Sequence, residues 1–387
     1  MVEVTHEQFI KILDYARENE VSVFCEGATG IGKSEAVWNR HKVIAADIER
    51  EFRDWNSFIL EDKELLASDD KYAAKFHVMV DIRAATMTET DMVGMPDFTV
   101  NKEYVEFKPR LMAKFLSQPS ASGCLFMDEI NQAPRSVQSS MFKVALDRTI
   151  GDLKMSKNIS VVAAGNRIED RASVTEMAAP LATRFLWTSL RIPTADEYID
   201  YNLKSQYPNA LITGYLKSYS DQLFTFKLTN KDKAFANPRA VQRLAKIICN
   251  LPAQDETDLE TLGLLSKASC GDAWGTKFTA YARMARKVDV NEILKNPASV
   301  KKYVDQPDMK YSIISAIAYK CKENFKTVIE PGLDVMSYLD EESAVFGLRV
   351  IKQYCGDDLR KHLIKKSDVW NNKLSAKVKQ YLGLDDK

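Results

Sequence analysis

The sequence is poor in the residues that build metal centres and disulfide frameworks. Among 387 residues there are six cysteines and four histidines, and no C-x-x-C pair occurs. Two of the cysteines, Cys25 and Cys124, fall inside apolar segments that we expect to form core strands. The pattern predicts reduced, buried thiols and argues against both a disulfide framework and a zinc site.

A charge bias and a long apolar run are also missing. Lysine plus arginine and aspartate plus glutamate both number 54, so the formal net charge is zero. This balance weakens a nucleic-acid-binding interpretation without excluding it, because no excess of positive charge attracts a phosphate backbone. No run approaches the roughly 18 apolar residues that a membrane-spanning helix needs. The first residues carry no basic-plus-apolar targeting signal, so we expect a cytoplasmic protein with no membrane partner.

The sequence does contain the phosphate-binding motif G-x-x-x-x-G-K-[ST], at residues 27–34. A β-branched and aromatic segment at 21–25 precedes it, and residues 35–38 can open a helix. Strand, glycine loop and helix are the context this motif needs, since backbone N–H groups and the helix N-terminus then surround the phosphates. The predicted nucleotide-binding residues are Gly27, Ala28, Thr29, Gly30, Ile31, Gly32, Lys33 and Ser34.

Four side chains have predicted chemical roles in this site. Lys33 can reach the β- and γ-phosphates of ATP, and the Ser34 hydroxyl can ligate Mg²⁺. Later in the chain, an apolar segment ends in Asp128 and Glu129. There, Asp128 can hold Mg²⁺ through water, and Glu129 can polarise the attacking water. The loop and the acidic pair together predict an ATP-hydrolysing enzyme with ATP and Mg²⁺ as cofactors.

A polar residue, Asn166, closes the apolar segment 159–165. If this segment forms a strand between the phosphate loop and the acidic pair, the Asn166 amide can orient water against the γ-phosphate. An asparagine in an ordinary turn after a strand would look the same. The other motifs favour the catalytic interpretation.

The predicted fold is α/β, with a doubly wound parallel sheet of five strands in the first half of the chain. Residues 39–75 have apolar residues at roughly helical intervals and predict an α-helical insertion, while residues 99–107 alternate like a hairpin. From Pro193 onward helical patterns dominate. The predicted strands are 21–25, 76–82, 124–128, 159–165 and 185–190.

These motifs, in this order, resemble those of AAA+ ATPases of the MoxR type, a family with bacterial and phage members. The resemblance covers roughly residues 20–250, and the segment from Gly271 looks like a C-terminal extension of the family. It implies an AAA+ core over 1–192 with inserts at about 39–75 and 93–110, a helical lid over 193–252 and a helical extension over 253–387. The segments that carry it are Gly27 to Ser34, Phe126 to Glu129, Gly165-Asn166, Pro180 to Phe185 and Asn237 to Ala240.

The resemblance also implies roles for three residues and a homo-oligomer, usually a six-membered ring with ATP at its subunit boundaries. Asn166 matches sensor 1, Arg184 matches the arginine finger that acts on a neighbouring subunit's ATP, and Arg239 matches sensor 2. The hairpins near 99–107 and 148–155 would face the ring pore. The family often works with a partner that carries a von Willebrand factor A domain.

Two residues depart from the family pattern. Arg167 follows Asn166 where proline is common, and Thr183 precedes Arg184 where an aspartate commonly orients the finger. The insertion at 39–75 is also longer than the resemblance implies. The alternative fingers are Arg148, Arg167 and Arg171.

Three functions fit these observations. The leading one is a ring-forming ATPase that remodels or activates a protein client. The second is a nucleic-acid-associated AAA+ motor or loader, which the neutral charge and the lack of a recognisable DNA-binding module disfavour. The third is a nucleotide-sensing switch that rarely hydrolyses ATP, which the intact Lys33, Asp128 and Glu129 disfavour.

Overall fold

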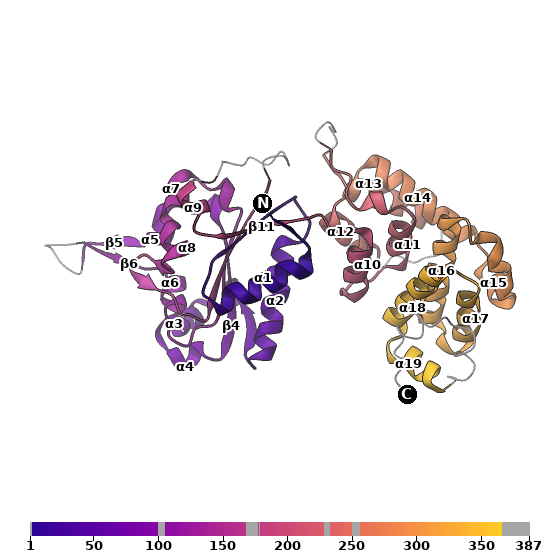
Figure 1. Cartoon of the computed structure of the whole chain (residues 1–387), viewed down its shortest axis with the longest axis horizontal. Coiled ribbons are helices and arrows are strands. Elements are labelled where there is room, and N and C mark those ends of the chain that lie inside the picture. The colour runs from indigo at the N-terminus through magenta and orange to yellow at the C-terminus, as the bar shows by residue number, and fades with distance from the viewer. Residues whose placement is uncertain are drawn as a thin grey trace. The chain divides into compact units, whose positions relative to one another are not determined.

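The computed structural model describes residues 2–99, 105–167, 177, 179–227, 233–249 and 256–365. The chain forms two compact units, Met1–Ile192 and Pro193–Lys387. The first unit contains the sheet, and the second is helical (Figure 1).

A seven-stranded parallel sheet forms the centre of the first unit. Its three central strands read as near-continuous apolar runs, as expected for strands covered on both faces. In spatial order the strands are β1 (Glu3–Val4), β11 (Leu186–Leu190), β2 (Val23–Gly27), β10 (Ile159–Gly165), β7 (Gly123–Asp128), β4 (Phe76–Arg83) and β3 (Glu51–Asp54).

All five predicted strands are present, and two edge strands add to them. The edge strands β1 and β3 have two and four residues, too few to show a period-2 pattern in the sequence. They form because a neighbouring strand offers free backbone groups: β1 pairs with β11, and β3 pairs with β4. The predicted five-stranded sheet is thus corrected to seven strands.

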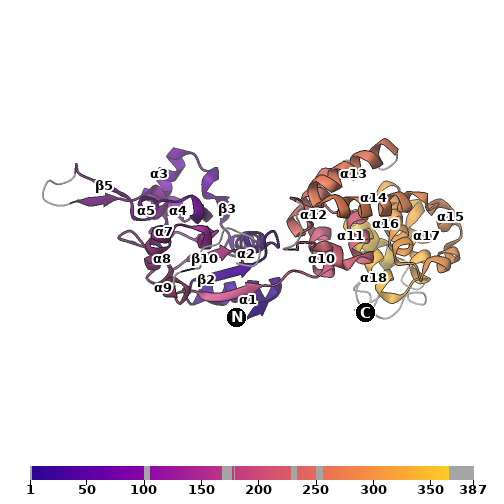
Figure 2. The same cartoon turned by 90° about the horizontal axis from the view of Figure 1, so that it is seen from above.

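Helices cover both faces of the sheet (Figure 2). On one face lie α1 (His6–Glu18) and α2 (Lys33–Asp47). The other face carries a separate apolar core, to which short helices contribute Leu66, Met92, Phe115, Val137 and Leu181. These helices are α3 (Leu60–Ser68), α4 (Asp70–Ala73), α5 (Glu89–Val93), α6 (Leu111–Leu116), α7 (Arg135–Ser140), α8 (Phe142–Leu146) and α9 (Ala179–Ala182).

The segment 39–75 is not the wholly helical insertion that the sequence predicts. Its first part belongs to α2, whose buried stripe continues to Ile44 and Ala45. The segment then forms the edge strand β3 before it returns to helix in α3 and α4. Phe52 of β3 contacts the Trp38 ring on α2 edge-on, with the ring centroids 5.9 Å apart. The aromatic residues of this segment therefore pack the strand against the helix.

Two antiparallel ribbons extend the first unit. In the first, β5 (Met95–Asp97) pairs with β6 (Glu106–Lys108), and the ribbon projects from the unit in Figure 1. The predicted turn of this hairpin, residues 100–104, lies outside the described residues. In the second, β8 (Thr149–Ile150) pairs with β9 (Leu153–Lys154). The first ribbon therefore pairs 95–97 with 106–108 and begins before the predicted range 99–107, while the second lies within the predicted range 148–155.

The second unit is helical in its described parts and has one apolar core that runs from Tyr198 to Leu363. Tyr215 lies in the predicted lid and contacts Trp274 and Phe278 of the predicted extension, with ring centroids 5.1 and 5.2 Å apart. The boundary predicted at 252/253 lies outside the described residues. The helices are α10 (Ala195–Lys204), α11 (Ala210–Ser218), α12 (Pro238–Ile248), α13 (Glu256–Cys270), α14 (Asp272–Lys287), α15 (Val290–Lys295), α16 (Pro307–Glu323), α17 (Phe325–Ser337), α18 (Glu341–Cys355) and α19 (Asp357–Lys365).

The cysteines in the sheet are buried thiols. Cys25 lies in β2 and Cys124 in β7, and all six cysteines of the chain are free. Burial raises the pKa of the Cys25 thiol to about 12, so the thiol is protonated at neutral pH. In the described part of the chain, no helix has both the length and the apolar content needed to cross a bilayer.

Candidate nucleotide-binding site

The phosphate-binding motif forms a tight loop between β2 and the N-terminus of α2. Gly30 and Gly32 have positive φ angles of 78° and 100°, which glycine adopts without the steric cost of a Cβ. At Gly27, a Cβ would lie 2.9 Å from the Leu190 carbonyl oxygen of β11 and 2.8 Å from the Ile31 side chain. The loop therefore needs glycine both for its turns and for its packing against the neighbouring strand.

The Lys33 side chain folds back over this loop. Its ammonium donates hydrogen bonds to the carbonyl oxygens of Gly27 and Ala28, at 2.7 and 3.0 Å, and to Asn166 Oδ1 at 3.1 Å. Thr29 Oγ1 donates to the same Asn166 oxygen at 3.3 Å. The structure thus brings Asn166 at the end of β10 to the predicted lysine, as the sheet order requires.

Ser34 and Asp128 meet at the carboxyl ends of two strands. The Ser34 hydroxyl donates to Asp128 Oδ2 at 3.2 Å, although the residues lie 94 positions apart. Hydroxyl and carboxylate oxygens are the hard ligands that Mg²⁺ prefers, and Mg²⁺ commonly takes only one or two protein ligands beside water and phosphate. The donor set at this point therefore fits Mg²⁺ bound by Ser34 and, through water, by Asp128.

Glu129 has a left-handed backbone, with φ 56° and ψ 34°. This region is uncommon for residues other than glycine and costs roughly 1–3 kcal/mol. The Glu129 N–H donates to Asp128 Oδ1 at 3.0 Å, so the chain turns sharply directly after β7. The turn takes Glu129 out of the alternation of β7, and its side chain stays half-buried at the strand end.

A second carboxylate lies on the same face of the sheet, one strand away. Trp38, one helical turn after Ser34, donates from its indole Nε1 to Asp81 Oδ2 of β4 at 3.3 Å. Burial and the neighbouring Asp128 carboxylate raise the pKa of Asp81 to about 6. Neither Trp38 nor Asp81 was predicted as a site residue. One sequence pattern could have identified Trp38: it lies four residues after Ser34, so both side chains are on one face of the helix.

Two further residues contact the site without having been predicted. The ring nitrogen Nε2 of His6, at the start of α1, lies 2.9 Å from the Ile31 carbonyl oxygen of the loop. Asn131 Nδ2, in the short helix Ile130–Gln132 after Glu129, donates to the Asn166 carbonyl oxygen at 2.7 Å. Both contacts join residues far apart in the sequence, so no local sequence pattern predicts them.

Arg184 lies two residues after the end of α9, where two contacts hold its half-buried side chain. Its guanidinium donates to the Pro180 carbonyl oxygen and lies 5.1 Å from the centroid of the Phe142 ring. Thr183 Oγ1 donates to the same carbonyl at 3.3 Å. The Pro180 carbonyl oxygen thus accepts from both the Thr183 hydroxyl and the Arg184 guanidinium.

The alternative fingers differ in their surroundings. Arg148 is buried, and its guanidinium donates to the carbonyl oxygens of Ser156 and Ile159 inside its own unit. These bonds oppose a role in a neighbouring subunit. Arg167 is half-buried next to Asn166, and Arg171 lies outside the described residues.

Arg239 belongs to the second unit. It is exposed in the first turn of α12, directly after Pro238. The Asn237 side chain caps this helix by accepting from the Ala240 N–H at 2.8 Å. The local cap and proline match the predicted start of a lid helix, and the role of Arg239 toward ATP stays a prediction.

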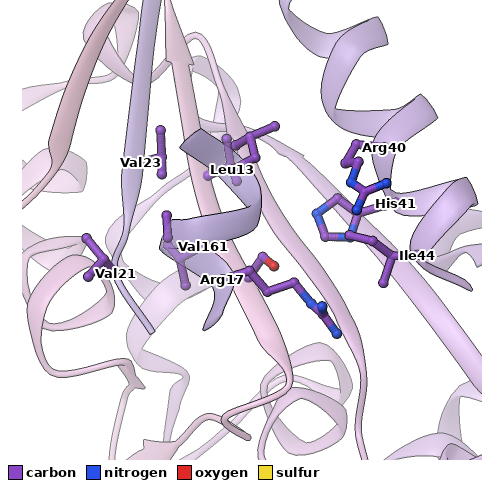
Figure 3. A pocket seen from close by; sticks show the side chains of 11 residues that line it. Leu13, Arg17, Val21, Val23, Arg40, His41, Ile44 and Val161 are labelled. Carbon is purple, nitrogen blue, oxygen red and sulfur yellow. The ribbon is translucent and has the colours of Figure 1, made fainter. Parts of the chain in front are cut away.

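A small cavity lies between α1, α2 and the sheet, away from the glycine loop. Its volume is about 10 Å³, near the minimum for one water molecule. Figure 3 shows Arg17 of α1 and His41 of α2 beside it. His41 Nδ1 lies 2.9 Å from Nε2 of His77, whose Nδ1 lies 2.8 Å from Ser122 Oγ. This buried polar chain joins α2 to the sheet.

Comparisons with known proteins find solved structures of similar fold and no match to a family model or a curated protein. A mutant form of RuvB from Thermotoga maritima is 13% identical, with 85% of each chain covered and a TM-score of 0.35. Cdc6p from Pyrobaculum aerophilum is 11% identical, with 99% of this chain and 95% of that chain covered and a TM-score of 0.40. NtrX from Brucella abortus in complex with ATP is 14% identical, with 82% and 67% covered and a TM-score of 0.34.

Proposed function

We propose that this protein is a ring-forming AAA+ ATPase that hydrolyses ATP with Mg²⁺ and uses the energy to remodel or activate a protein client. The observation that carries the proposal is the convergence of Lys33, Ser34, Asp128 and Asn166 through hydrogen bonds of 3.1 and 3.2 Å. These four residues come from α2, β7 and the end of β10, and they meet beside a glycine loop at a helix N-terminus.

The loop supports binding of the ATP phosphates. The N-terminus of α2 provides backbone N–H groups and a partial positive charge for an anion. The Lys33 ammonium already lies among oxygen acceptors of the loop, and phosphate oxygens carry more negative charge than the carbonyl and amide oxygens around it. We therefore infer that ATP draws Lys33 toward its β- and γ-phosphates.

The acidic pair supports hydrolysis. Ser34 and, through water, Asp128 would hold Mg²⁺, which would supply positive charge against the negative charge that develops on the phosphate during hydrolysis. Glu129, turned out of β7 by its left-handed backbone, would accept the proton of the attacking water. The Asn166 amide would orient this water against the γ-phosphate.

The proposal also includes an arginine finger and a ring of subunits. Arg184, presented by the Pro180 carbonyl, would reach the ATP of the neighbouring subunit. Arg239 would contact the γ-phosphate of its own subunit. We further propose that the ring is hexameric and that the β5–β6 and β8–β9 ribbons face its pore. Phe98 and Phe107 on the first ribbon, 70% and 47% exposed, would contact the client.

One experiment tests the enzyme and the ring together. Purified protein should release phosphate from ATP in the presence of Mg²⁺, and it should sediment as a larger species with ATP than with ADP or without nucleotide. The γ-phosphate would add a charge-assisted contact between subunits, which ADP lacks. A protein that hydrolyses ATP as a monomer would contradict the ring alone. A protein that binds no nucleotide would contradict the whole proposal.

The client requires a separate experiment. A Glu129→Gln protein should hold ATP and its client, while Lys33→Ala/Glu129→Gln should hold neither. A protein retained by the first form only, and released on exchange for ADP, would qualify as the client. A von Willebrand factor A domain protein is the class that the family resemblance suggests. Retention of nucleic acid, with a steep salt dependence, would instead favour the motor or loader.

A further inference from the structure

The Asn131 side chain fills the space beside Gly165 at the end of β10. A Cβ built on Gly165 would lie 2.6 Å from Asn131 Oδ1, 2.8 Å from Cγ and 2.9 Å from Nδ2. All three of its nearest atoms thus belong to this one amide. The φ angle of Gly165 is not positive, so alanine would suit the backbone. A side chain at position 165 would therefore have to displace the Asn131 amide.

Asn131 also makes a directed hydrogen bond at this point. It is only 5% exposed, and its Nδ2 donates to the Asn166 carbonyl oxygen at 2.7 Å. A carbonyl oxygen can only accept, so the amide must turn its NH₂ group toward Asn166. Its Oδ1 is buried and makes no hydrogen bond with any described residue. Asn131 is thus a buried polar side chain with a single hydrogen bond among the described residues, and the acceptor of that bond is the Asn166 carbonyl oxygen.

The position of Asn131 connects the two catalytic strand ends. It lies two residues after Glu129, in the short helix that follows the left-handed turn, and it holds the backbone of the residue whose side chain contacts Lys33. We propose that Asn131 is a positioning residue that sets the distance between the Glu129 carboxylate and the Asn166 amide. This inference rests on the proposed ATPase function and adds a residue to its machinery.

The proposal predicts that loss of Asn131 lowers the rate of ATP hydrolysis and leaves ATP affinity nearly unchanged. Asn131 contacts Asn166 and Gly165, and Lys33 keeps its bonds to the Gly27 and Ala28 carbonyl oxygens without it, so loss of Asn131 should leave ATP affinity nearly unchanged. A displacement of about 1 Å at a catalytic group can cost about a hundredfold in rate. We expect Asn131→Ala to lower the single-turnover rate of ATP hydrolysis by about 10- to 100-fold, with ATP affinity within about threefold of the wild-type value. Asn131→Asp keeps the shape, lacks the N–H donor and should show a similar loss.

Gly165 provides the matched test. Gly165→Ala alone should lower turnover and the melting temperature, because its Cβ collides with the Asn131 amide. In the Asn131→Ala background the collision disappears, so Gly165→Ala should then add little further loss to either quantity. Gln132→Ala removes the neighbouring amide on the same short helix and should behave as wild type.

Each outcome has one meaning. Wild-type turnover in Asn131→Ala, or a loss of ATP affinity that accounts for the whole loss of rate, would overturn the positioning role while leaving the ATPase intact. Additive effects of Gly165→Ala and Asn131→Ala would overturn the packing on which it rests. A wild-type protein that binds ATP without hydrolysing it would overturn the proposed function first, and the inference with it.

Discussion

The side-chain carbonyl oxygen of Asn166 accepts a hydrogen bond from the Lys33 ammonium at 3.1 Å, across 133 positions of sequence. The contact follows from the sheet order, because β2 and β10 are parallel neighbours with Gly165 opposite Glu26. Their carboxyl ends therefore lie at one edge of the sheet, where ligands bind in open α/β folds. The following predictions start from this edge.

Lys33→Ala should abolish ATP binding. Lys33 is the only cation of the loop 27–34, so its loss leaves the β- and γ-phosphates without a charged donor there. We expect the affinity for a fluorescent ATP analogue to fall by more than about 100-fold, as expected for a charged hydrogen-bonding partner lost from a buried site. Lys42→Ala, on the exposed part of α2, is the control and should bind normally. Unchanged binding by Lys33→Ala would place the nucleotide elsewhere.

Glu129→Gln should bind ATP and hydrolyse it slowly. The amide keeps the size of the side chain and loses the ability to accept a proton from water. General-base catalysis contributes about 10²–10⁴-fold, so turnover should fall by that range in a phosphate-release assay. Glu89→Gln, an exposed carboxylate in the same unit, is the control. Normal turnover by Glu129→Gln would mean that another group acts as the base.

Arg184→Ala should lose most of its ATP hydrolysis, by about a thousandfold or more if the arginine acts as a finger. Nucleotide affinity of the isolated subunit should change little, because Arg184 contacts Pro180 and Phe142 and not the glycine loop. Mixing Arg184→Ala with Lys33→Ala subunits should restore some hydrolysis. At certain interfaces an intact finger would then meet an intact phosphate loop.

The rescue distinguishes the candidate fingers. Its absence in covalently linked dimers of the two mutants would remove the trans role of Arg184. If hydrolysis is restored only when Arg167 or Arg171, in place of Arg184, carries the alanine mutation, that residue is the finger. Arg148→Ala should instead lower the melting temperature, because its guanidinium binds carbonyl oxygens within its own unit.

The stability of the first unit should fall as the pH is lowered below about 6.5. Burial, together with Arg17 and Arg50, lowers the pKa of His77 to about 4, while the unfolded chain keeps the ordinary value of 6.5. His77 therefore contributes stability that is present above pH 6.5 and is lost as the pH falls through about 4, because the unfolded state binds the proton first. His41, whose Nδ1 lies 2.9 Å from His77 Nε2, is also buried and has a lowered pKa, so it contributes to the acid sensitivity in the same direction.

Denaturant unfolding followed by tryptophan fluorescence at pH 7, 5.5 and 4 checks this prediction. His77→Gln cannot titrate, so its stability should depend less on pH over this range. His362→Gln, in the second unit, should leave the pH dependence of the first unit unchanged. Equal pH dependence in wild type and His77→Gln would show that other groups cause the acid sensitivity.

Local patterns in the chain were sufficient to predict the parts of the site that are local. The residues of the loop 27–34 are consecutive, and several of them need a particular residue type: glycine for φ angles such as 100° at Gly32 and, in the proposed function, lysine for charge and serine for the metal. The apolar runs before Asp128 and Asn166 likewise marked the ends of buried strands. The three central strands β2, β10 and β7 were predictable because strands covered on both faces must be almost wholly apolar, and β4 and β11 were predictable from their β-branched and aromatic residues.

Tertiary structure alone decided which distant residues meet. The edge strands β1 and β3 form on free backbone groups of their neighbours, so the insertion at 39–75 could not be assigned correctly from helical spacing. The glycine at 165 depends on the Asn131 amide, and the raised pKa of Asp81 depends on burial beside Asp128. Such contacts arise from sheet order and register, which place side chains within a few ångströms across the sheet. A linear sequence carries the residues for these contacts, and the packing of the sheet brings them together.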